Sequence, residues 1–181
     1  LSIVLAVLIY RGIMFPIKFN REVDTRKAFV VERLKDIRSA QLAFRNVNGY
    51  YTSDFDSLIM FINEGKIPII RLEADPDDTT FTKQIIDTVG YATIIDSIFK
   101  NRENFNVNEI KFIPFSGKKE FELNAGTTIR GGVTVNVVEV FAANKYWLKD
   151  KLDDMIKFNM NPEDGLRFGS MTDPTTDGNW E

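Results

Sequence analysis

The chain opens with an apolar run that passes directly into a charged helical pattern, and this junction constrains the fold more than any other feature. Residues 1–19 read "LSIVLAVLIYRGIMFPIKF" and are apolar as far as Ile17, except at Ser2, Arg11 and Gly12. A membrane-spanning helix needs about 20 apolar residues, so the run is slightly short, and without an initiator Met we expect further residues upstream. No small-residue cleavage site follows it. The pattern therefore favours a transmembrane anchor over a signal peptide or a buried core helix.

The polar residues in and after this run indicate where it meets water or a partner. Arg11 is costly at the centre of a bilayer, so we expect it to reach the headgroups or to face another protein. Lys18 and Arg21 mark the exit from the apolar segment, although charges on one flank leave the topology open. The predicted membrane or partner interface comprises Leu1, Val4, Leu8, Arg11, Met14 and Pro16.

An amphipathic helix is predicted to follow. Its apolar positions from residue 23 onward, at helical spacings, are Val23, Val30, Leu34, Ile37, Phe44 and Val47. Of these, Val30, Leu34, Ile37 and Phe44 are predicted to cover a sheet. Asn48-Gly49 supplies the left-handed residue that ends a helix. A second short helix is expected after Ser53 or Asp54, either of which can serve as its N-cap.

The rest of the chain predicts a small antiparallel sheet. We expect an acidic loop over residues 72–84, a hairpin over 109–123, and a strand over 133–141 with a bulge near Val137 and Val138. Residues 85–99 are ambiguous between helix and strand. A short helix is predicted over 144–158, with an apolar face of Trp147, Leu148, Leu152 and Ile156. The fold class is therefore α+β, with a transmembrane anchor over 1–19 and a soluble head over 20–181.

Composition narrows the function. The 181 residues include neither histidine nor cysteine, which removes the commonest general base, the commonest metal ligand and all thiol chemistry. The net charge of −3 does not indicate a nucleic-acid partner. No pair of carboxylates and no Ser-Lys pair stands out by its spacing. We expect no enzyme and no catalytic residues.

The first third of the chain resembles a known family. The segment "FPIKFNREVDTRKAFVVERLKDIRSAQLAFRNVNGYYTSDFDSL" is similar to the N-terminal half of type IV pilins and of the major pseudopilins of type II secretion. Pro16, the Asn-Arg-Glu exit at 20–22 and Asn-Gly-Tyr-Tyr at 48–51 carry this likeness. The chain also resembles uncharacterised single-span envelope proteins of Bacteroidota. The resemblance implies a pilin-like fold, but Arg11 is unusual in a pilin span, and the peptidase site and buried glutamate would lie upstream.

The acidic tail "GSMTDPTTDGNWE" resembles the tail of major pseudopilins, near which a loop holds calcium. This resemblance implies Asp173 and Asp177 as calcium ligands; otherwise we expect no cofactor. The alternative is a solvated acidic tail that docks through Trp180. In both interpretations Trp180 anchors the tail.

Two functions remain open. The first is a non-enzymatic structural or assembly subunit of a secretion or cell-envelope machine, in contact with the membrane and with other subunits or copies of itself. The second is a single-span envelope protein whose head is a ligand- or protein-binding module. In either case we expect the bacterial inner membrane, crossed once, with the head in the periplasm.

Overall fold

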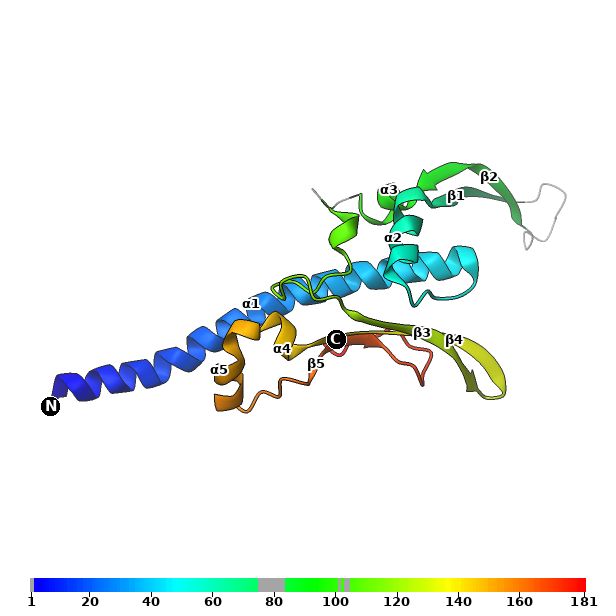
Figure 1. Ribbon diagram of the computed structural model, residues 1–181. Coiled ribbons are helices and arrows are strands. Elements are labelled where there is room, and N and C mark those ends of the chain that lie inside the picture. The colour runs from blue at the N-terminus through cyan, green and yellow to red at the C-terminus, as the bar shows by residue number, and fades with distance from the viewer. Residues whose placement is uncertain (1, 75–83, 101, 103–104) are drawn as a thin grey trace.

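A computed structural model describes residues 2–74, 84–100, 102 and 105–181, and the side chains of these except 2–8, 72–74 and 84–87 (Figure 1). It confirms the α+β class, with one long N-terminal helix and small antiparallel sheets. The helices and strands are α1 (Ser2–Asn48), α2 (Phe55–Glu64), β1 (Lys66–Ala74), β2 (Gln84–Thr93), α3 (Ile94–Ile98), η1 (Val107–Glu109), β3 (Glu122–Arg130), β4 (Val133–Ala143), α4 (Asn144–Trp147), η2 (Lys149–Lys151), α5 (Leu152–Lys157) and β5 (Gly165–Gly169).

The helix α1 dominates the molecule. Its 47 residues run through Pro16 and reach about 70 Å at 1.5 Å per residue. The helix ends at Gly49, whose φ of 83° is left-handed and whose N–H donates to the Arg45 carbonyl at 2.7 Å. The C-terminal half passes through the head, whereas the N-terminal half projects beyond it (Figure 1). The predicted stop at Asn48-Gly49 is therefore confirmed.

The larger sheet has the order β3-β4-β5, with all pairs antiparallel. Gly131 and Gly132 connect β3 to β4 with φ angles of 56° and 81°, the geometry of a tight type I′ hairpin. The predicted bulge near Val137 and Val138 is wrong, because the β3–β4 register runs without a shift. Both valines are buried nevertheless, so the sheet is covered on both faces at this point.

The tail covers one of those faces. Met171 lies against Gly126, which pairs with Val137 and therefore shares its face of the sheet. Trp180 packs against the core, and a bridge joins Phe168 to Gly178. The predicted anchoring of the tail by Trp180 is what the structure shows.

The other face of the sheet packs against α1. Val30, Leu34 and Ile37 are completely buried, and Phe44 is nearly so. They share one core with residues of the sheet, including Val138, Val140, Leu166 and Phe168. Val47, predicted for the same stripe, is instead half exposed beside Ile67 and Ile98. The apolar stripe of α1 is therefore the surface against which the core of the head packs.

A buried polar pair orients the chain after α1. Gln41 is inaccessible to water; its amide donates to the Thr52 carbonyl at 2.8 Å and accepts from the Thr52 N–H at 3.2 Å. Both main-chain groups of Thr52 are thereby satisfied inside the core. The next helix, α2, has Asp54 as its N-cap, and the Asp54 carboxylate accepts from the Ser57 N–H at 2.7 Å.

The strands β1 and β2 form a two-stranded arm beyond α2, with a register shift between Ile69 and Ile70. The ambiguous segment 85–99 is thus strand first and helix α3 afterwards. The predicted acidic loop 72–84 is too long, because residues 72–74 belong to β1 and Gln84 to β2. Its remaining residues, 75–83, lie outside those that the structure describes.

Two other predicted elements need correction. The hairpin over 109–123 is reduced to a single bridge between Phe112 and Glu120, preceded by the short helix η1. The helix over 144–158 is broken into α4, η2 and α5, although Trp147 and Leu148 of its predicted apolar face are both buried. Ile156 is consequently exposed, and Met155 enters the core instead.

The buried stripe of α1 predicts a clear contrast between neighbouring residues. Leu34→Ala or Ile37→Ala should lower the free energy of unfolding by about 2–5 kcal/mol, since each leaves a cavity in a closed core. Lys35→Ala is the control, because Lys35 is exposed on the same turn. Chemical denaturation of the three variants measures this, and equal small losses would show that α1 does not carry the core.

Candidate interaction surface at the base of the head

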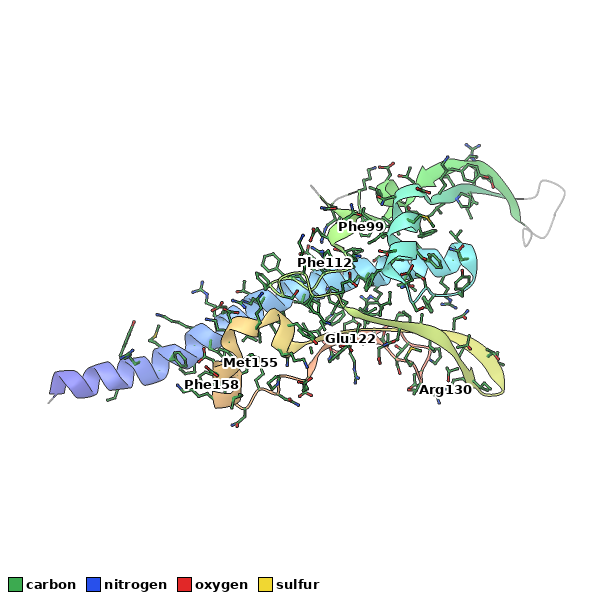
Figure 2. All side chains as sticks on the ribbon, viewed as in Figure 1. Phe99, Phe112, Glu122, Arg130, Met155 and Phe158 are labelled. Carbon is green, nitrogen blue, oxygen red and sulfur yellow. The ribbon has the colours of Figure 1, made fainter. Side chains whose placement is uncertain are left out.

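The base of the head is where α1 leaves the sheet and the end of α5 meets it. Phe158 follows α5 at this end of the head (Figure 2). It stacks on buried Phe19, with ring centroids 4.9 Å apart, and also contacts Phe15 at 5.7 Å. These three rings lie just where the projecting half of α1 begins. Packing of the helix against the head therefore extends to Phe15.

An ion pair fixes the same junction from another side. Arg26 donates to the Asp150 carboxylate at 2.9 Å, to Glu22 at 2.6 Å and to the Trp147 carbonyl at 3.1 Å. Pairing with Asp150 raises the pKa of Arg26, and the same hydrogen bond lowers the pKa of Asp150. The direction in which α1 leaves the head is thus held by charge as well as by aromatic stacking.

A groove of about 540 Å³ opens beside the three rings. It is lined by residues of α1 and by the end of α5: Tyr10, Arg11, Gly12, Met14, Phe15, Pro16, Lys18, Lys157 and Phe158. Three of these are cations and none is a carboxylate. Lys157 places its Nζ 4.4 Å from the centroid of the Phe15 ring, a cation–π contact. The groove is therefore apolar in its floor and positive at its rim.

A different face of the projecting helix is purely apolar. Ile9, Ile13 and Ile17 recur at every fourth residue and are 55%, 57% and 52% exposed. We call these three residues the isoleucine stripe. At about 100° per residue, Arg11 lies about 160° around the helix from Ile9 and Ile13. The isoleucine stripe and Arg11 of the positive rim therefore lie on nearly opposite sides of α1.

The predicted interface residues divide into two groups. Arg11, Met14 and Pro16 line the groove together. Leu1, Val4 and Leu8 have side chains outside those that the structure describes. Over the part of the chain that was described, no helix is long and apolar enough to cross a membrane.

Sequence reasoning missed Lys157 and Phe158. Their positions at the end of a short helix carry no local signal, since only the tertiary fold brings α5 back to the base of α1.

An acid with a strongly raised pKa lies elsewhere, in the middle of α1. Burial raises the pKa of Asp36 to about 6, although Arg102 donates to it at 2.8 Å and Arg33 is close by. Arg102 also pairs with Glu32, and Arg33 donates to the Glu109 carbonyl. These charges satisfy one another and tie α1 to the segment before β3, which makes the cluster structural.

The acids predicted to bind calcium have separate partners. Asp173 pairs with Arg130 at the tip of β3, and Asp177 accepts from the Thr175 hydroxyl at 2.6 Å. Among the residues with described positions, no group of three or more acidic side chains lies together as a metal site would need. Calcium binding by Asp173 and Asp177 stays a prediction of the resemblance.

Comparisons of the chain with protein-family models, with curated proteins and with solved structures give no match.

The buried Asp36 predicts a specific pH dependence. The folded state keeps the proton of this carboxyl to higher pH than the unfolded chain does, so its contribution to stability falls as the pH rises from about 4 to about 6. Water reaches part of the carboxylate, so we expect a fall on the order of 1–2 kcal/mol.

Asp36→Asn isolates this effect from the other carboxyls. The free energy of unfolding of wild type minus that of the variant, from denaturation at several pH values, should fall as the pH rises across that range, because only the wild type has this carboxyl to ionise. A difference that is constant with pH, or that grows as the pH rises, would contradict the raised pKa.

Proposed function

We propose that the protein is a non-enzymatic, membrane-anchored structural or assembly subunit, pilin-like or pseudopilin-like, that joins a secretion or cell-envelope machine through the projecting half of α1. One observation carries the proposal: a single helix has its C-terminal half in the core of the head and its N-terminal half outside, with large apolar side chains exposed. A neighbouring apolar surface can cover the exposed side chains of such a helix.

The isoleucine stripe supplies the contact. Its side chains are more than half exposed, and a fully buried isoleucine contributes about 1.5–3 kcal/mol relative to an exposed one. Three of them in a row favour packing against an apolar helix surface, and a second copy of α1 offers the same stripe. Since Phe19, Phe158 and Arg26 hold the direction of the helix, subunits joined in this way would share a common orientation.

Membrane attachment in a bacterial inner membrane, with the head in the periplasm, is part of the same proposal. Its support is the sequence of residues 1–10, which is apolar apart from Ser2 and continues directly into the projecting helix. The chain resembles type IV pilins and major pseudopilins, and in those proteins too an apolar N-terminal helix continues as an amphipathic helix into a head that contains a sheet.

A second candidate function is a membrane-tethered binding module. A groove of about 480 Å³ between α2 and the segment around η1 favours it, with Met60 and Phe112 beside Asp56 and Lys111. In that case the helix would be only a tether, and the head would act as a monomer.

Assembly through the stripe is tested by Ile13→Asp in residues 1–181. Light scattering in mild detergent should show the wild type as an oligomer. The variant should dissociate at a concentration at least about tenfold higher, because a carboxylate replaces an apolar contact.

Ile129→Asp is the matched control: Ile129 is also an exposed isoleucine, but it lies at the tip of the β3–β4 hairpin. It should leave the oligomer unchanged. A wild-type chain that is monomeric at all concentrations would favour the tethered module, and equal dissociation of both variants would place the interface elsewhere.

A further inference from the structure

No described carboxylate of the head pairs with the positive rim of the base groove. Arg11, Lys18 and Lys157 are all exposed, and no ion pair links any of them to a carboxylate among the residues whose side chains are described. By contrast, Arg26, Lys145 and Lys151 are each paired with Glu or Asp. The three rim cations therefore form a coherent positive site with an apolar floor.

From this geometry we propose that the base of the head docks on anionic lipid headgroups, with Arg11, Lys18 and Lys157 at the phosphate level and Phe15 and Phe158 beneath them. The proposal rests on the membrane attachment in the proposed function and adds to it the lipid class and the contribution of α5. Charge complementarity selects the occupant, since the rim has three cations and the groove lining has no acid.

The dimensions agree with a bilayer surface. Arg11 and Lys18 are seven residues apart, or about 10 Å along α1. The headgroup region of one leaflet is about 5–8 Å thick, from the difference between the whole bilayer and its hydrocarbon core. Both cations can reach that layer while their stems cover the apolar groove, as long basic side chains do at interfaces. Arg11 then needs no place in the hydrocarbon.

The aromatic residues of the groove suit the same position. Tyr10 is largely exposed beside Arg11, and an amphipathic ring of this kind is favoured at the membrane–water boundary. The residues before it continue as an apolar helix, so the groove lies where an apolar segment ends and a polar head starts. An acidic protein would complement the rim charges equally well, but it would not use this transition from apolar to charged surface.

Lys157 separates this inference from simple anchoring. It lies on α5 in the head, 139 positions after Lys18 in the sequence, and a helix that served only as a tether would not involve it. Lys157→Gln removes one cation of the rim and leaves the sequence of α1 unchanged. Lys66→Gln is the matched control, because Lys66 is an exposed lysine at the start of β1 on the distant arm (Figure 1).

The experiment measures partitioning of residues 1–181 into vesicles of phosphatidylcholine alone and into vesicles that also contain phosphatidylglycerol, by flotation. We expect wild type to prefer the anionic vesicles, and the preference to weaken as salt is added. Lys157→Gln should reduce that preference about fivefold, and the double variant Lys18→Gln with Lys157→Gln about 25-fold, since a basic residue near an anionic surface contributes about 1 kcal/mol. Lys66→Gln should change nothing.

Circular dichroism and a denaturation midpoint equal to wild type would show that the variants are folded. Equal partitioning into both kinds of vesicle overturns the inference and leaves assembly through the isoleucine stripe intact. A preference for anionic vesicles that survives Lys157→Gln overturns it as well, because another surface of the protein would then bind the anionic lipid. Failure to bind either vesicle overturns the inference together with the membrane attachment, whereas the oligomer measurement still decides assembly.

Discussion

The burial of one stripe of α1 is the interaction on which the rest of the structure depends. From Phe19 to Phe44 this stripe supplies the wall against which the sheet and α2 pack, including the fully buried Leu34 and Ile37. No other described helix is longer than ten residues, so none could replace it. The tail is attached to the same helix, because Arg38 donates to the Thr176 carbonyl at 3.1 Å and to Glu181 at 2.8 Å. The head is therefore organised around a helix that continues beyond it.

The continuation is what connects fold to function. A helix that is held at Phe19 and Arg26 and that exposes Ile9, Ile13 and Ile17 would transmit the orientation of the head to whatever binds its projecting half. Two faces of that half differ in chemistry: the isoleucine stripe suits another apolar helix, and the cationic rim suits an anionic surface. Both can be occupied at once, because they lie on different sides of α1. This division of the two faces is the basis of the proposed assembly at a membrane surface.

Local patterns predicted much of this fold. The stop at Gly49, the strand β4 and the long amphipathic helix each follow from short-range periodicity or from a residue with special backbone freedom. The long-range features did not. Nothing near Lys157 or Phe158 indicates that α5 returns to the base of α1, and Gln41 gave no sign that it would bind Thr52. The expected bulge at Val137 was wrong for the same reason, since the tail that buries this residue lies far along the chain.

Hydrogen exchange along α1 tests most directly whether one helix is both core and unpartnered projection. In the dispersed monomer, amides from Val30 to Phe44 should exchange only through global unfolding, while those from Ile9 to Ile17 should exchange orders of magnitude faster. On assembly or insertion into a bilayer, protection should rise strongly over Ile9 to Ile17 and change little beyond Val30. Rapid exchange across Val30 to Phe44, or no gain of protection in the projecting half, would contradict the account.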